Sequence, residues 1–180
     1  AGGNGKNLFI KMPAGNGFIF GNPKFDWGYH SVKQAQLNNR KIYFARGKGL
    51  GGTSIVNGMV YIRGVAQDYD NWRQMGLDGW GYSDLLPYFK YSEGSTNRQN
   101  NFHGNQGPLK VEPARNFSLL DKAFIKAAVE TGHEFLDDFN ANKRAGVSRI
   151  DSTTYRGVRQ SSAISYLNKI PKNLKIFTNT

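Results

Sequence analysis

Several features that would narrow the chemistry of this chain are missing from its sequence. There is no cysteine, which excludes disulfide frameworks, thiolate metal sites, iron–sulfur clusters and cysteine nucleophiles. No apolar run approaches the ~18 consecutive residues of a membrane-spanning helix. The three histidines stand alone, without the paired spacing of a metal site. We therefore predict no metal and no transmembrane segment.

Acidic residues are scarce: 13 Asp and Glu face 24 Lys and Arg, a net charge of +11. Such an excess favours nucleic acid or an anionic membrane as a partner. The basic residues are spread from Lys6 to Lys175, however, and no block of five like charges occurs, which is typical of a solvated surface. A basic nucleic-acid-binding module remains an alternative, and it predicts binding whose log K falls linearly with log salt.

The length of 180 residues suits one domain, and 13% aromatic residues argue against disorder. The first half predicts a short strand at 41–44, a helix over 65–75, and a second helix capped by Ser83 with Pro87 in its first turn.

The second half predicts a strand at 109–112 and a helix over 118–131 that ends at Gly132. A strand over 147–154, a helix over 159–167 and a strand at 174–178 follow. The predicted fold class is therefore α/β, with helices and strands mixed (α+β).

Glycine is abundant, with 22 residues, and Gly47–Gly52 satisfies the pattern G-x-G-x-x-G. The dinucleotide fingerprint also needs a preceding apolar strand and an acidic residue ~20 positions later. The run at 42–44 is short and half polar, while Asp68 and Asp70 come too early, so we reject a self-contained Rossmann unit here. A Walker A loop also fails because Lys48 is followed by Gly.

The same stretch still offers a chemically useful surface. Gly51 and Gly52 carry no Cβ, and from Thr53 the chain is predicted to turn helical. Free N–H groups at a helix start suit a phosphate, and Thr53 and Ser54 add hydroxyl donors. Gly58 would weaken a helix by ~1 kcal/mol, so a close ligand or a closely packed backbone there is a fair explanation. An ordinary Gly-rich loop is the alternative.

The longer string R-G-K-G-L-G-G-T-S-I-V-N-G-M-V-Y-I-R-G at 46–64 resembles the first signature of the glucose–methanol–choline (GMC) flavoprotein oxidoreductases. Other segments resemble that family in the same order along the chain, and the choline dehydrogenase and alcohol dehydrogenase branch is the most similar. These segments are Ala1–Gly3, Asp26–Tyr29, Asp68–Trp72, Gly79–Phe89, His103–Pro108, Gly157–Leu167 and Asn173–Thr178.

The resemblance implies an enzyme that oxidises an alcohol to a carbonyl by hydride transfer to the flavin of FAD. Residues 1–108 would form part of a Rossmann-like FAD-binding domain, with a lid at about 65–90. Residues 109–170 would form part of a sheet-and-helix substrate domain, and 171–180 a strand that returns to the FAD-binding domain. A small-molecule alcohol is the implied substrate, and the electron acceptor stays open.

The resemblance also implies which residues contact FAD. No His lies between Ser54 and Val60, so we predict FAD held without a covalent bond. The implied cofactor-binding residues are Gly49, Gly51, Gly52, Thr53, Ser54, Asn57, Gly58, Met59 and Val60.

The family's catalytic His belongs to a motif that would lie beyond Thr180, and His30, His103 and His133 do not match it. We therefore expect no catalytic residue in this chain, and we expect it to be an inactive segment of a protein about three times as long. A lyase on the same fold is a further alternative. We expect a cytoplasmic or peripheral-membrane location.

Three other polar sites have ordinary interpretations. Arg63 could neutralise a phosphate or form a surface ion pair. His103 before Gly104 suits a turn, and Asp137-Asp138 suits a loop or cap.

Overall fold

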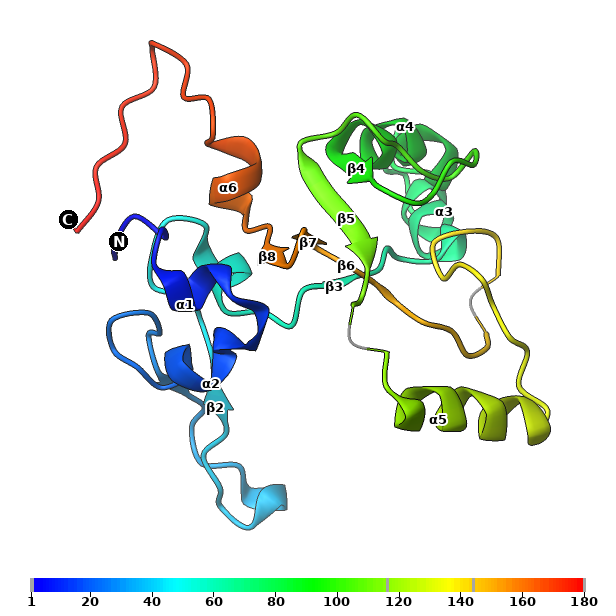
Figure 1. The fold of residues 1–180 in the computed structure, drawn as a ribbon, viewed down its shortest axis with the longest axis horizontal. Helices are drawn as coiled ribbons and strands as arrows, with labels where there is room; N and C mark the ends of the chain where they lie inside the picture. Colours follow the sequence, from blue (N-terminus) through cyan, green and yellow to red (C-terminus); the bar gives the residue numbers. More distant parts are fainter. Residues whose placement is uncertain (1, 116, 144, 180) are drawn as a thin grey trace. The chain divides into compact units, whose positions relative to one another are not determined.

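The computed structural model of the chain describes residues 2–115, 117–143 and 145–179. Ala1, the first residue of the predicted Ala1–Gly3 segment, lies outside the described residues. The chain forms two compact units: unit 1 holds the residues up to Met59 and those from Thr154 onward, and unit 2 holds Val60–Thr153. Helices and strands are mixed in the chain, as predicted (Figure 1). The predicted FAD-binding and substrate domains have boundaries that differ from those of the two units. Because these domains were defined by the ligands that they bind, they stay a prediction.

Unit 1 is built from short elements around a small apolar core of Ile10, Ile19, Phe25, Ile55 and Val56. Its elements are α1 (Leu8–Lys11), η1 (Pro13–Gly15), α2 (Asn16–Ile19), β1 (Tyr29–His30), η2 (Ala35–Leu37), β2 (Tyr43–Phe44), η3 (Gly52–Ile55), β7 (Thr154–Tyr155), β8 (Val158–Arg159) and α6 (Ser162–Tyr166). The pairs β1–β2 and β7–β8 are antiparallel.

Asp26, in the segment before β1, explains how this glycine-rich region holds one conformation. Its carboxylate accepts hydrogen bonds from the N–H groups of Gly21, Gly28 and Arg46 at 3.0 Å and from the Tyr43 hydroxyl. Burial acts to raise the pKa of Asp26, but these hydrogen bonds outweigh it and lower the pKa to about 2. One carboxylate therefore ties together parts of the chain that are up to 25 residues apart.

Unit 2 contains a four-stranded sheet in the order β3-β6-β5-β4. Its elements are β3 (Val60–Tyr61), α3 (Ala66–Gln74), α4 (Tyr82–Ser92), β4 (Glu93–Ser95), β5 (Leu109–Pro113), α5 (Leu119–Glu130) and β6 (Asp151–Ser152). Strands β4 and β5 are parallel, with Glu93 opposite Leu109, and the other pairs are antiparallel. Tyr69 and Trp72 of α3 pack against the rings of Trp80 and Phe89, which joins α3 to α4.

The predicted helices α3 and α5 are confirmed, including the Ser118–Asp121 capping box and the left-handed Gly132. The second helix was wrong in detail, since α4 begins at Tyr82 and Pro87 lies inside it. Asp84 accepts from the N–H of Gly81, and Asp70 of α3 accepts from the N–H of Tyr82, so the helix starts a turn before the proline.

Two predicted strands were also wrong in extent. Residues 147–154 split between β6 in unit 2 and the start of β7 in unit 1, while Val147 makes only a bridge to Phe135. Residues 173–179 form no strand, although the N–H of Asn179 donates to the Gly2 carbonyl at 3.0 Å. A strand needs a paired neighbour, which local patterning cannot supply. No helix of the described residues is long and apolar enough to cross a membrane.

Candidate cofactor-binding site

The glycine-rich loop 47–52 is packed most closely at Gly47, where no side chain would fit. A Cβ on Gly47 would collide with the carbonyl group of Gly52. Gly49 pairs with Gly3 in a parallel bridge, and the N–H of Leu50 donates to the Gly3 carbonyl at 2.8 Å. The glycines thus bring two backbone segments of unit 1 side by side without side chains between them.

The chain turns at Gly51 and Gly52, which have φ angles of +102° and +55°. The helix expected from Thr53 is only one turn of 3-10 helix, η3, starting at Gly52. Such a short turn has no substantial dipole, so the start of η3 gives no support to phosphate binding, which stays a prediction. Thr53 is exposed, so its hydroxyl is accessible to a ligand.

Ser54 was predicted to contact FAD, but its hydroxyl is already engaged within unit 1. Its Oγ donates to the Gly51 carbonyl at 2.5 Å and accepts from the N–H of Ser162 at 2.9 Å. These bonds attach the start of α6 to the loop. A contact of the Ser54 side chain with a cofactor stays a prediction.

The segment after η3 exposes a polar, open backbone. Asn57 and Gly58 are exposed, and a Cβ on Gly58 would meet no atom within 4 Å. Met59 is buried and has a φ of +62°, which is strained for a residue with a long side chain. Val60, the last predicted contact residue, begins β3 and so belongs to unit 2.

Arg159 of β8 holds this segment in place, although the sequence assigned it no role. It is fully buried. Its Nη1 donates to the backbone carbonyl of Asn57 at 2.7 Å and to the Asn57 Oδ1 at 2.8 Å. Burial lowers the pKa of Arg159 to about 10, so the guanidinium remains protonated at neutral pH. The only sequence signal for Arg159 was its position within the G-x-R-x-S motif at 157–161. Its partner Asn57 lies 102 residues away and could not be predicted from that motif.

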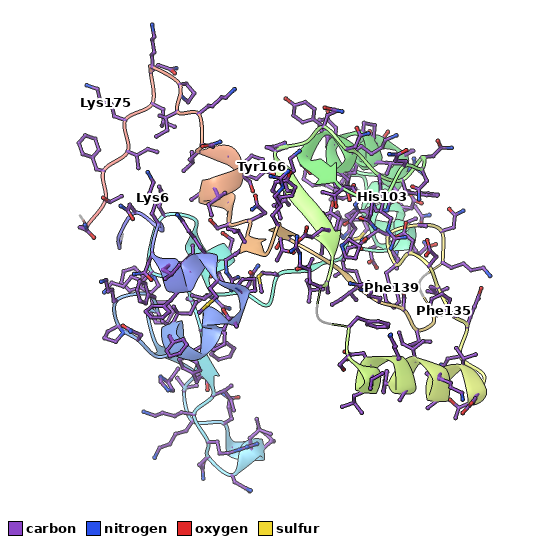
Figure 2. All side chains as sticks on the ribbon, viewed as in Figure 1. Lys6, His103, Phe135, Phe139, Tyr166 and Lys175 are labelled. Carbon is purple, nitrogen blue, oxygen red and sulfur yellow. The ribbon has the colours of Figure 1, made fainter. Side chains whose placement is uncertain are left out.

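A cavity of about 610 Å³ lies next to the loop in unit 1. Its walls include Gly2, Gly3 and Gly49 together with Lys6, Lys24 and Lys48, and none of the described residues that line it is acidic. Figure 2 shows Lys6 near the start of the chain. Three lysines beside half-buried glycine backbone fit an anionic group such as the diphosphate of FAD. Lys6 and Lys24 were missed from the sequence because they lie outside the signature.

Unit 2 contains a separate buried cluster of charged side chains. His103 donates or accepts at both ring nitrogens, with Nδ1 2.7 Å from Glu93 Oε1 and Nε2 2.8 Å from Asp138 Oδ2. Arg63 Nη2 donates to Glu93 Oε2 at 2.6 Å. The interpretations of Arg63 as a phosphate ligand or a surface ion pair are both wrong, because its side chain is buried in this cluster.

The cluster holds its charges by mutual compensation. Burial acts to lower the pKa of His103, but its hydrogen bonds to Asp138 and Glu93 and their charges raise it to about 9. Burial acts to raise the pKa of Asp138, but bonds to His103 and from the Asn140 N–H lower it to about 2. His103, labelled in Figure 2, therefore links β4 to the 137–140 segment and is more than a turn residue.

Comparison with known proteins decides the family. Residues 11–180 match the GMC oxidoreductase family, in its N-terminal region. The chain belongs to this family. The resemblance drawn from the sequence motifs is confirmed.

Individual relatives agree with this assignment. The GMC chain is 43% identical over 92% of its length to the oxygen-dependent choline dehydrogenase of Sinorhizobium fredii. It is similar to the crystal structure of pyridoxine 4-oxidase from Mesorbium loti, with a TM-score of 0.87, 32% identity and 94% of the chain covered. An FAD-dependent oxidoreductase from Chaetomium thermophilum is similar with a TM-score of 0.83, 28% identity and 94% coverage.

The GMC chain spans only part of these relatives. It covers 30% of the Sinorhizobium fredii protein, 33% of the pyridoxine 4-oxidase chain and 31% of the Chaetomium thermophilum chain. The relatives therefore have a large region to which the described residues have no counterpart.

Proposed function

We propose that this chain forms part of an FAD-dependent oxidoreductase that converts an alcohol to a carbonyl compound, and that unit 1 binds part of the FAD without a covalent bond. The observation that carries the proposal is the acid-free cavity of unit 1. It presents Lys6, Lys24 and Lys48 over glycine backbone and shares Lys48 and Gly49 with the family signature. Membership of the GMC family supports the same assignment.

The residues of unit 1 have distinct tasks in this proposal. The three lysines neutralise the diphosphate, while Gly3 and Gly49, which line the cavity, let the backbone approach the ligand. Asn57 and Gly58 present an exposed amide and an open backbone to the flavin portion. Bound FAD supplies the hydride acceptor for the oxidation.

Choline is the alcohol to test first, because two similar curated relatives carry the name oxygen-dependent choline dehydrogenase. Pyridoxine is the second, because of the similar pyridoxine 4-oxidase structure. We propose that the residue accepting the hydroxyl proton lies in the region of the relatives that this chain does not cover.

The proposal is tested with the full-length protein. We expect FAD to bind, and Lys48→Ala to raise its Kd about tenfold, equivalent to about 1.4 kcal/mol. Lys175→Ala is the matched control, because that lysine lies outside the cavity lining. Equal FAD affinity in both variants would contradict the assignment of this cavity.

Substrate reduction of the flavin separates an oxidoreductase from a lyase. We expect anaerobic addition of choline, or of another primary alcohol, to bleach the visible absorption of the oxidised flavin in the holoenzyme. A holoenzyme that converts an alcohol without any bleaching would favour the lyase alternative.

A further inference from the structure

The guanidinium of Arg159 is surrounded by neutral acceptors, although it is fully buried in unit 1. Nε donates to the Ile10 carbonyl at 2.9 Å, and Nη2 donates to Asn16 Oδ1 at 2.6 Å. No carboxylate among the described residues forms an ion pair with it. Burying a cation without a counter-ion is costly, so the contacts it makes are expected to matter.

The contact with Asn57 fixes which way the side-chain amide points. Nη1 of Arg159 donates to Asn57 Oδ1 at 2.8 Å. Arginine only donates, so the amide atom facing it must be the oxygen and not the nitrogen. The N–H of Met59 also donates to this oxygen, at 3.3 Å. With two donors on Oδ1, the NH₂ group of Asn57 is turned away from Arg159.

The NH₂ group is therefore available to a ligand. Asn57 is exposed, and the neighbouring Gly58 has open space where a Cβ would lie. Arg159 itself is buried and cannot touch a ligand at this surface. Any effect of Arg159 on the cofactor must pass through the residues that it holds.

We infer that Arg159 is a positioning residue that orients Asn57 as a hydrogen-bond donor toward the bound cofactor. This inference rests on the proposed binding of FAD by unit 1. The acceptor on the ligand is a carbonyl oxygen or an unprotonated ring nitrogen, since Asn57 offers only N–H groups there. The charged guanidinium stays in the protein interior, and it acts on the ligand only by orienting the neutral amide of Asn57.

Asn57→Asp separates this role from a merely structural one in the full-length protein. The carboxylate still accepts from Arg159 and supplies the missing counter-ion, so we expect the melting temperature of the apoprotein to stay or rise. It has no NH₂ group, so we expect the Kd for FAD to rise at least tenfold and the flavin absorption maximum to shift. If Asn57 had only a structural role, the affinity for FAD would change only as far as the melting temperature does.

Asn16→Asp is the matched control, because it places the same charge beside the same guanidinium at Nη2. It removes only the 3.3 Å bond from Asn16 Nδ2 to the Asn57 carbonyl. We expect a similar effect on the melting temperature, with FAD affinity within about threefold of the unmodified protein. Wild-type affinity and spectrum in Asn57→Asp, or equal losses in both variants, would overturn the inference.

A double-mutant cycle gives a second, independent test. Arg159→Lys keeps the charge but replaces the planar fork, which bonds Ile10, Asn16 and Asn57 at once, by one shorter ammonium group that cannot reach all three. We expect it to weaken FAD binding in the wild-type background and to cause no further loss beside Asn57→Leu. Additive losses would contradict action through Asn57, and if Arg159→Lys does not fold, the two Asp variants decide. A full-length protein that binds no FAD at all would instead refute the proposed function.

Discussion

At the scale of single residues, the glycines of the signature have two different reasons to be glycine. Gly47 is packed against the protein's own backbone, while Gly58 faces open space at an ordinary backbone conformation. The first requirement concerns folding, and the second has no explanation within the described structure. The close approach of a ligand to Gly58 would supply that explanation.

Gly58→Ala is therefore expected to leave folding intact and to weaken cofactor binding. We expect an unchanged melting temperature of the apoprotein and a Kd for FAD at least ~10-fold higher, about 1.4 kcal/mol. The control is Gly17→Ala in α2, where a Cβ also meets nothing within 4 Å. Fluorescence titration of FAD measures both, and a wild-type Kd in Gly58→Ala would refute the close approach.

A residue-level prediction could be made from the sequence where the chemistry is local. The segment from Gly49 to Met59 could be singled out because its signature is continuous. Lys6, Lys24 and Arg159 could not, since they reach the same region only through folding. The hydroxyl of Ser54 was expected to be free, but α6 engages it from 108 residues away.

At the scale of elements, the buried His103 cluster joins β4 to loops that are distant in sequence. Asp138 and Glu93 hold His103 between them, and Arg63 after β3 completes the cluster. Four charges that compensate one another are strongly coupled, so losing one leaves the others unpaired. The cluster predicts how the stability of unit 2 depends on pH.

The contribution of His103 is fully present below its unfolded pKa, ~6.5, and is lost as pH rises through about 9. The contribution of Asp138 is present above its unfolded pKa, ~3.9, and is lost as pH falls through about 2. We therefore expect protection of unit 2 to be greatest between about pH 4 and 6.5. Amide hydrogen exchange of residues 93–112 measures it.

His103→Gln is expected to lower the protection free energy of this region by ~3 kcal/mol at pH 6 and to abolish its decline between pH 6.5 and 9. His133→Gln, at an exposed position, is the control and should keep that decline. A variant His103→Gln with the same pH profile as the wild type would show that the cluster does not set it.

Helices were easier to predict than strands. The α5 helix carries its own signals, Ser118 and Asp121 at the start and Gly132 after the end. The start of α4 depends on Asp70 of another helix, and the strands of residues 147–154 depend on partners far along the chain. Local patterning contains no information about such partners.

At the scale of the whole molecule, the chain belongs to the GMC oxidoreductase family. It spans about a third of the relatives' length, and we propose that the catalytic base lies in the region that it does not cover. We expect the 180-residue chain alone to oxidise no choline or other alcohol, and the full-length protein to do so. Alcohol oxidation by the isolated chain, measured with an artificial electron acceptor, would contradict this expectation.

The state of the flavin tests the central claim most directly. The full-length protein is purified, its visible spectrum is recorded, and it is then denatured and filtered. We predict a yellow filtrate with the two absorption bands of flavin and a colourless polypeptide, because residues 54–60 contain no histidine to attach it. Colour retained on the polypeptide would contradict the non-covalent site, and a folded protein that is colourless and takes up no FAD would contradict the account as a whole.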